Sequence, residues 1–537
     1  MTQPASPPTS SVRSTIGKAA LIILLATIAG RALGLVRDTA IAYFFPPADT
    51  DAFFLAYRIP YLLTLTISGA LTATFVPLFS YRLATDRRKE AWDLSVNVGN
   101  VITLVVVALS VILIVVAPWL IPLVGFGFVE ETADKTVFLF QIMMIGFTFE
   151  VLAGLVISML NSLKRFALAA FAPALGTIAT LAITILFAKT LNITALAVGT
   201  VAGWILGCVV LFPGLRDQQI HYRPRINWHD SALREVGAMI FPILIGSSVG
   251  KVGIFVNQIL ASNLDEGSGS SLSYAEKFFQ FPLGLFVAGI MVPIFPLLSE
   301  QVAANASDKV KDTVSFSLRL LGFMMVPITV GIILLRYPLI GLVLQHGKFG
   351  PEDTARTAMV LLFLCLGLYP YAGRDTFVRV FYAYHDAKTP VNISVATVVI
   401  NCGLSYLLMK TPLGVGGLAL GTTIALLINF VILIWLLRRK IGQMGLREIG
   451  FSLGRVLLVS AVMGIAVWAV DSCLAGVVSN TTGGNFIRVI LGLVVGVAVF
   501  LISARLTKMP ELAEVTDMLR VVLKRKKSSD LQEKHCD

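Results

Sequence analysis

The stretch that decides the fold is LIILLATIAGRALGLVRDTAIAYFF, residues 21–45. As a helix it would cross a hydrocarbon core about 30 Å thick, because each residue adds about 1.5 Å. Arg31, Arg37 and Asp38 interrupt it, yet the apolar pattern continues on both sides. Arg31 and Asp38 lie seven residues apart and therefore share one face of a helix. The stretch predicts a membrane-spanning helix whose charges serve a purpose inside the protein.

The whole chain shares this apolar character. Of its 537 residues, 56% are hydrophobic and 14% are charged, whereas a soluble domain carries about 25% charged residues. The mean hydropathy is +0.83. These values exclude a soluble enzyme, a disordered chain and a disulfide-stapled scaffold. We therefore expect an all-α polytopic membrane protein, in which the net charge of +12 belongs to basic loops rather than to a nucleic-acid surface.

Fourteen segments are apolar and long enough to cross a membrane, since a spanning helix needs about 20 residues. We expect helices at 19–45, 52–80, 94–124, 136–160, 168–188, 192–212, 236–262, 272–298, 315–345, 355–384, 390–409, 414–437, 451–474 and 484–506. Two six-helix lobes followed by two further helices account for this number.

The two halves of the chain are weakly similar. The shift that places Arg58 on Lys277 also places Asp38 on Asn257, so that a basic residue recurs in the second helix of each half. Transporters commonly contain such repeats, with the substrate site between them. We expect a cytoplasmic segment at 1–18, an N-lobe at 19–212, a linker at 213–235, a C-lobe at 236–437, the last two helices within 438–506 and a basic tail at 507–537.

The charges of the loops predict the orientation of the chain. Lysines and arginines gather in alternate loops, at 82–89, 164–165, 213–235 and 438–447, and in the tail at 524–527. The intervening loops at 46–51, 125–135 and 263–271 are mainly acidic. We therefore expect both termini in the cytoplasm and the acidic loops outside.

Several charges lie inside the predicted spans, where each costs about 2.5–3.5 kcal/mol on insertion scales. Helices 1, 2, 7 and 8 would line a water-filled cavity with Arg31, Arg37, Arg58, Lys251 and Lys277. Asp38 and Glu276 oppose these five cations, which leaves an excess of three positive charges. Such a cavity favours an anion, and guanidinium groups suit phosphate oxygens. The alternative is internal pairing, of Asp38 with Arg31 and of Glu276 with Lys277 or Lys251.

Other charges in the spans have simpler explanations. Arg374 and Asp375 would form a structural pair. Arginines near predicted helix ends would extend toward the interface: Arg336, Arg379, Arg455 and Arg488. The sequence contains no nucleotide-binding motif, so we expect no cofactor and a transport step that is passive or driven by an ion gradient or the membrane potential.

Six motifs resemble those of one family. They are RALGLVRD at 31–38, TDAFFLAYRIP at 50–60, GALTATFVPLFS at 69–80, LNSLKRF at 160–166, YAEKFFQFPLG at 274–284 and RDTFVRVFYAYHDAKTP at 374–390. Over about residues 15–506 the chain is similar to the MurJ (MviN) lipid II flippases of the multidrug/oligosaccharidyl-lipid/polysaccharide exporter superfamily.

This resemblance implies a function and its site. Members move lipid II, the undecaprenyl-pyrophosphate-linked disaccharide-pentapeptide, across the bacterial cytoplasmic membrane, and we expect alternating access. The family's essential cations map to Arg31, Arg37 and Lys277, its acid to Asp38, and a further basic position to Arg58.

The resemblance also implies a role for the last two helices and a set of binding partners. Helices 451–474 and 484–506 resemble those that form a groove for the polyprenyl tail. Besides lipid II, the implied partners are membrane lipids, with cell-wall synthesis or division proteins as further candidates.

The chain departs from the family pattern at four positions. Thr64 and Leu65 stand where many members carry an arginine pair, and Lys277 stands where many have arginine. Asn257 stands where the family often has an acid that is tied in some members to sodium. An amide still ligates sodium but lacks the charge, so the sequence predicts weak sodium dependence or none.

Three other functions remain open at this point. A flippase for another polyprenyl-pyrophosphate-linked glycan would share the phosphate site. A MATE-like cation or drug antiporter would need an acidic cavity, contrary to the basic one expected here. A non-transporting membrane scaffold would explain the altered residues Thr64 and Leu65.

Overall fold

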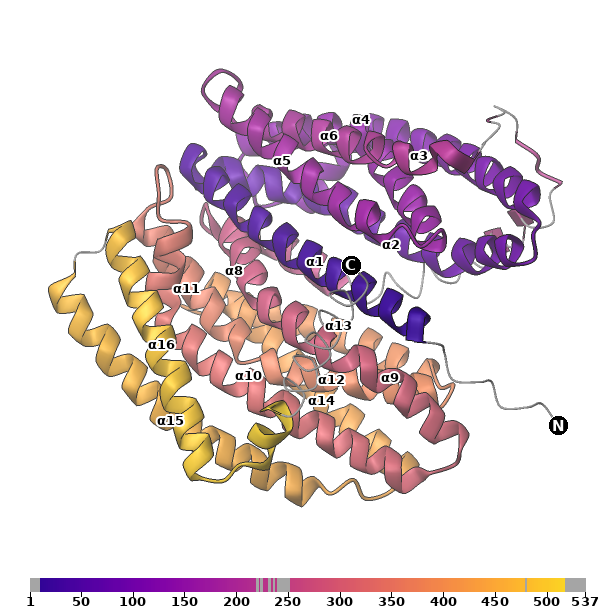
Figure 1. Ribbon diagram of the computed structural model, residues 1–537. Coiled ribbons are helices and arrows are strands. Elements are labelled where there is room, and N and C mark those ends of the chain that lie inside the picture. The colour runs from indigo at the N-terminus through magenta and orange to yellow at the C-terminus, as the bar shows by residue number, and fades with distance from the viewer. Residues whose placement is uncertain are drawn as a thin grey trace, which may run out of the picture. The chain divides into compact units, whose positions relative to one another are not determined.

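The computed structural model describes residues 10–218, 252–478 and 481–516, and, between these, residues 222, 226–229, 233–234 and 237–238. Its first half consists of α1 (Ser10–Phe44), α2 (Pro47–Ala84), α3 (Arg88–Val124), α4 (Glu130–Ser162), α5 (Phe166–Leu191), α6 (Thr194–Val209) and the short η1 (Phe212–Gln218). Long helices are expected here, because a lipid-exposed backbone must satisfy its own hydrogen bonds. Figure 1 shows them as the indigo to magenta ribbons.

The second half is also helical. It begins with an apolar helix at Val252–Ala261. There follow α8 (Ser268–Pro282), the π-helix η2 (Leu283–Val287), α9 (Ala288–Ala303), α10 (Ser307–Val343), α11 (Pro351–Cys365), α12 (Leu368–Ala383), α13 (Lys388–Met409), α14 (Val415–Ile441), α15 (Leu446–Val477) and α16 (Thr482–Leu506). The π turn follows Pro282, which lacks the N–H group that regular helical bonding requires.

The all-helical prediction is confirmed for the described residues. Ten of their helices are long and apolar enough to span a membrane, and an eleventh span results if α11 and α12 are joined across their 42° bend. The predicted number of fourteen is not confirmed, partly because most of the predicted helix at 236–262 lies outside the described residues.

The chain divides into two compact units. One comprises residues 1–274, 343–353 and 409–418, and the other comprises 275–342, 354–408 and 419–537. The first unit therefore contains α1 to α6 together with the start of α8 and the loops that follow α10 and α13. The lobe boundaries read from the sequence stay a prediction.

Backbone geometry supports the internal repeat. Three turns in the first half contain a residue with positive φ. In the second half, a residue with positive φ recurs about 220 residues after each of them. The pairs are Asp86 and Asn305 (58° and 54°), Lys164 and His385 (60° and 56°), and Asn192 and Gly414 (49° each). Residues other than glycine adopt positive φ rarely, so chance is a poor explanation for this recurrence. The first pair has the shift of 219 residues that aligns Arg58 with Lys277, and the other two are offset by 221 and 222 residues.

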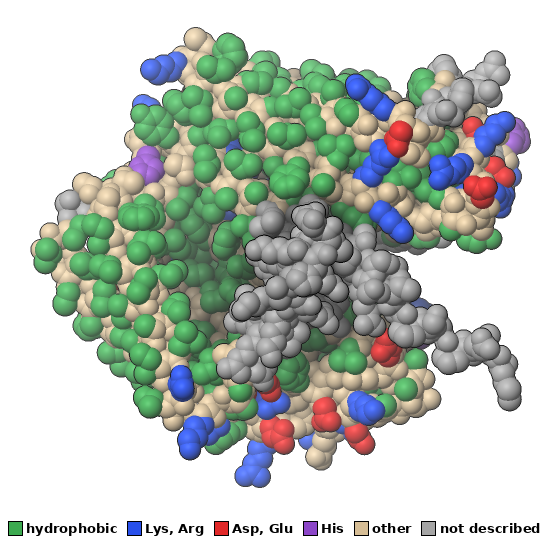
Figure 2. All heavy atoms as spheres, in the orientation of Figure 1, with side chains coloured by type: hydrophobic (Ala, Val, Ile, Leu, Met, Phe, Trp, Pro, Cys, Tyr) green, Lys and Arg blue, Asp and Glu red, His purple; other side chains and the backbone are tan. Residues whose placement is uncertain are grey.

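Hydrophobic side chains cover much of the described surface, and charged side chains gather near the margins in Figure 2. Among the exposed residues are Leu186 (72%), Leu458 (71%) and Ile465 (67%), each within a long helix. A large exposed apolar area is a liability in water but is suited to lipid. The surface therefore agrees with a membrane-embedded protein.

Helices α15 and α16 run side by side (Figure 1). An ion pair between Arg488 and Asp471 joins them. Arg488 Nε donates to Asp471 Oδ1 at 2.8 Å, and its Nη2 donates to Asp471 Oδ2 at 2.9 Å. Arg488 is 9% exposed. The prediction that Arg488 extends to the interface is therefore wrong: its charge is compensated by a carboxylate on the neighbouring helix.

Helices α5 and α6 approach closely where both carry glycine. A Cβ atom on Gly203 would lie 2.4 Å from Thr180 Oγ1 and 2.5 Å from the carbonyl oxygen of Gly176. One turn later, a Cβ on Gly207 would have its nearest neighbour, the carbonyl oxygen of Ala172, at 3.6 Å. Small residues permit such helix contacts in membranes, where van der Waals packing holds helices together.

This difference predicts opposite results for two similar substitutions. Gly203→Ala should destabilise the purified protein by about 1–3 kcal/mol, because the added methyl group forces α5 and α6 apart. Gly207→Ala should leave stability unchanged or raise it slightly. Thermal unfolding in detergent measures both, and equal melting temperatures for the two variants would contradict the close packing.

Candidate functional site

Helix α1 carries two of the predicted cations, and one of them pairs with the adjacent acid. Arg37 Nη2 donates to Asp38 Oδ1 at 3.2 Å, and its Nε lies 3.4 Å from the same oxygen. Asp38 is buried, whereas 26% of the Arg37 side chain is exposed. The pair compensates the acid and leaves part of the guanidinium accessible. Arg31 is half-buried on the same helix.

A second polar group connects α2 to the helix at Val252–Ala261. Arg58 Nη2 donates to Gln258 Oε1 at 3.3 Å. Ser273, near the start of α8, donates its hydroxyl to the same Gln258 oxygen at 3.3 Å. Gln258 is 2% exposed, so its amide oxygen organises a buried junction of three segments. Because an amide is neutral, Gln258 orients the guanidinium of Arg58 without cancelling its charge.

Asp51 holds the beginning of α8. Its Oδ2 accepts a hydrogen bond from the Gly267 backbone N–H at 2.7 Å, and its Oδ1 accepts one from the Ser270 N–H at 2.5 Å. N–H groups at the start of a helix have no partner within it, and the positive end of the helix dipole also favours the carboxylate. Asp51 is 3% exposed. A Cβ on Gly269 would lie 3.3 Å from Asp51 Oδ1, so a small residue lets the two segments meet.

Other segments in the first unit also meet closely at this end of the helices. A Cβ on Gly127 would lie 2.3 Å from the carbonyl oxygen of Ser262. Gly347 has φ +59°, and a Cβ there would lie 2.1 Å from the carbonyl oxygen of Tyr43. The Lys348 N–H donates to that same oxygen at 3.2 Å. The loops that follow α3 and α10 are therefore joined to neighbouring segments by contacts that leave no space for a methyl group.

The remaining predicted residues are distributed over both units. Lys277 and Glu276 are half-buried on α8 within the second unit. Asn257 is 3% exposed and precedes Gln258 in the first unit. Lys251 lies outside the described residues.

The charges of α12 pair differently from the prediction. Asp375 accepts from Arg379 Nε at 3.0 Å, one helical turn away, and Arg374 Nη2 donates to Ser394 Oγ at 3.2 Å. The pairing of Arg374 with Asp375 that the sequence suggested is therefore wrong: Asp375 is taken by Arg379, which lies on the same helix face one turn away.

Sequence reasoning missed Asp51, Gln258 and Ser273. Asp51 was placed in an external acidic loop, although it lies within the family-like motif TDAFFLAYRIP. For Gln258 the signal was the Asn-Gln pair in the otherwise apolar run VGIFVNQILA at 252–261. Buried amides are normally hydrogen-bonded, so such a pair indicates a polar partner on another segment.

Comparison with known proteins identifies the family of the chain. The model of the family described as "Lipid II flippase MurJ" matches residues 41–513. The chain belongs to the MurJ family. The "Lipid II flippase MurJ" of Burkholderia cenocepacia is 28% identical over 427 residues, 77% of this chain and 82% of that protein. The "Probable lipid II flippase MurJ" of Synechocystis is 28% identical over 545 residues, 97% of this chain and 100% of that protein. Family membership makes the chain a membrane transporter and not an enzyme.

Solved structures show the same fold. A "Lipid II flippase MurJ, inward closed conformation" aligns with a TM-score of 0.74 at 24% identity, covering 90% of this chain and 99% of that one. An inward-facing MATE transporter of the MOP superfamily aligns with a TM-score of 0.69 at 13% identity, covering 77% and 95%. The chain thus shares its fold with both of these structures.

The Asp51 contact predicts a local change on substitution. Asp51→Ala should speed amide hydrogen exchange of Gly267 and Ser270 by about tenfold or more, because a hydrogen bond to a charged group contributes about 1.5–3 kcal/mol. Exchange of peptides covering 263–272, followed by mass spectrometry, measures this.

A neighbouring acid provides the control. Asp49 forms a surface ion pair with Lys135 at 3.2 Å, and such pairs contribute about 0–1 kcal/mol. Asp49→Ala should therefore leave exchange at 263–272 unchanged. Equal effects of the two substitutions would show that Asp51 does not hold the start of α8.

Proposed function

We propose that the chain flips lipid II across the bacterial cytoplasmic membrane by alternating access, using a cationic site. Membership of the MurJ family supports the substrate. The observation that carries the mechanism is the placement of arginines inside α1 and α2, one beside a buried acid and one on a buried amide. Charges inside spans are costly, and those that are retained usually serve transport.

The substrate explains why these residues are cationic. Its pyrophosphate is anionic, and guanidinium groups bind phosphate oxygens with two parallel hydrogen bonds. Arg31, Arg37 and Lys277 would contact the pyrophosphate or the adjoining sugar, and Arg58 would support them electrostatically. Asp38 orients Arg37 and Gln258 orients Arg58, while the polyprenyl tail stays in lipid beside α15 and α16.

Opening at one membrane face would require the Asp51 contact to break. The loop charges support a cytoplasmic location for both termini, which places Asp51, Gly127 and Gly347 at the external end of the helices. In the proposed cycle, the headgroup enters from the cytoplasmic side while this end is closed. It leaves after Asp51 releases the N–H groups of α8.

The orientation is tested by labelling. The five native cysteines are replaced, and single cysteines are introduced at 87–89 and at 263–266. An impermeant thiol reagent applied to intact cells should label 263–266 and spare 87–89. Labelling of 87–89 from outside would overturn the orientation.

The cavity cations are tested by complementation of flippase-depleted cells. Arg31→Ala and Arg37→Ala should fail to restore growth although the proteins accumulate normally, because loss of a charge-assisted contact of about 1.5–3 kcal/mol weakens binding about 10- to 150-fold. Arg37→Lys should restore growth partly, since it keeps the charge without the planar fork. Lys277→Arg should be tolerated.

Controls separate binding from folding. Arg87→Ala removes an exposed arginine that pairs with Glu90 and should complement fully. If Arg37 were only a structural partner of Asp38, Arg37→Ala would lower protein abundance and the further substitution Asp38→Ala would restore it. Normal lipid II flipping by a well-expressed Arg31→Ala/Arg37→Ala variant would rule out the cationic site.

A further inference from the structure

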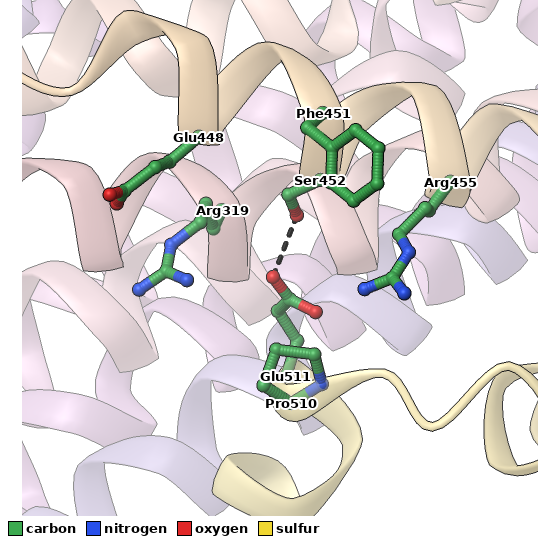
Figure 3. Close-up of a pocket in the computed structure, with 7 residues that line it drawn as sticks. All are labelled: Arg319, Glu448, Phe451, Ser452, Arg455, Pro510 and Glu511. Atoms are coloured by element: carbon green, nitrogen blue, oxygen red, sulfur yellow. Dashed lines mark hydrogen bonds between the residues drawn. The ribbon is translucent and has the colours of Figure 1, made fainter.

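A cavity of about 200 Å³, lined by four charged side chains, lies in the second unit, apart from the residues proposed for transport. It is formed by α10, the first turns of α15 and the short helix that starts at Pro510. Its lining residues are Arg319, Glu448, Phe451, Ser452, Arg455, Pro510 and Glu511 (Figure 3).

The walls of this cavity are fixed by buried contacts. Ser452 Oγ donates to Glu511 Oε1 at 2.7 Å, and Glu511 is 1% exposed. Met509, Leu512 and Val515 pack into an apolar cluster that includes buried residues of α10, α15 and α16. The cavity is therefore a built feature and not a gap beside a loose tail.

The cavity contains two arginines whose charges are not paired with a carboxylate in the described part of the chain. Figure 3 shows Arg319 and Arg455 on either side of the Glu511 carboxylate. Within the described part of the chain, neither forms an ion pair, and the buried Nε of Arg319 has no hydrogen-bond partner. The guanidinium of Arg455 lies 4.9 Å from the ring centre of Phe451. A partly buried guanidinium whose charge no carboxylate pairs with is unfavourable, so the site favours an anion.

The acids of the cavity favour a cation close to that anion. Glu448 is exposed at the rim, so its carboxylate is open to a ligand. Two arginines and two glutamates line the cavity, which gives a net charge of zero. A zwitterion matches this pattern better than a simple anion does.

The position and size of the cavity identify the class of ligand. It lies at the interfacial end of α15, whose exposed residues Phe451, Leu458 and Ile465 follow one another at intervals of seven along the helix. An acyl chain could follow this stripe while its headgroup occupies the cavity. Pockets for drug-sized molecules measure about 300–1,000 Å³, so this one is too small for a disaccharide-peptide.

We propose that this cavity binds the headgroup of a membrane phospholipid that carries both a phosphate and a primary ammonium group. Arg319 and Arg455 bind the phosphate, and Glu448 binds the ammonium group. Basic pockets between membrane helices near the surface bind the phosphate-bearing headgroups of lipids, and the two arginines supply such a basic element here. The bound lipid would hold the short helix that starts at Pro510 against α10 and α15.

Native mass spectrometry of the full-length chain in detergent tests this. The probes are dihexanoyl phosphatidylethanolamine, phosphatidylcholine and phosphatidylglycerol, and inorganic phosphate. Phosphatidylethanolamine should bind most tightly, and Arg319→Gln and Arg455→Gln should each weaken it about tenfold or more. Glu448→Gln should weaken phosphatidylethanolamine and not phosphatidylglycerol.

The matched control is Arg505→Gln, which removes an exposed arginine at the end of α16 outside the cavity and should leave binding unchanged. Melting temperatures without lipid identify variants that fail to fold, and Arg455→Lys, which keeps the charge, should retain part of the affinity. Three results would overturn the proposal: wild-type affinity in both arginine variants, tightest binding of phosphatidylglycerol, or full displacement of the lipid by an equal concentration of phosphate. None of them bears on the proposed flipping of lipid II.

Discussion

Hydrocarbon solvates charge poorly, so every ionised group inside the spans needs either a compensating partner or a function. Arg488 and Arg37 both bond to an aspartate, yet they differ in what remains open. Arg488 is held by both oxygens of Asp471 and its side chain is 11% exposed, so its pair is complete and joins two helices. Arg37 contacts a single oxygen of Asp38 and is 26% exposed. An incompletely satisfied, accessible guanidinium is suited to a ligand, whereas a complete pair is suited to structure.

The same constraint determines where in a transporter a polar contact can break at low free-energy cost. Asp51 holds α8 through backbone N–H groups at the helix end, and the glycines 127, 269 and 347 allow neighbouring segments to approach closely at this end. At a membrane surface, water can replace these hydrogen bonds when they break, so opening costs less than the rupture of a pair in the hydrocarbon core. In the proposed cycle, a charge-assisted cap near water would be strong enough to close one end and weak enough to open.

Much of the fold could be predicted because hydropathy is a local property. The apolar segments at 94–124 and 390–409 end at the same residues as α3 and α13. The site was harder, because its partners are distant: Asp51 meets Gly267 216 residues away, and Arg58 meets Gln258 200 residues away. A spacing rule identifies a face of one helix and says nothing about which other helix lies against it. For this reason, the charge of Arg488 was recognised but its partner Asp471 was not.

The internal repeat suggests how a cationic site arises in this scaffold. Asp38 and Asn257 occupy equivalent positions in the two repeats, as do Arg58 and Lys277. The basic residue is thus kept in both halves, while the acid is present in one and replaced by an amide in the other. An aspartate at 257 would add a carboxylate next to Gln258, the residue that binds Arg58, and would cancel one positive charge. The amide avoids this, so Asn257 leaves uncancelled one of the positive charges that we propose for binding the pyrophosphate.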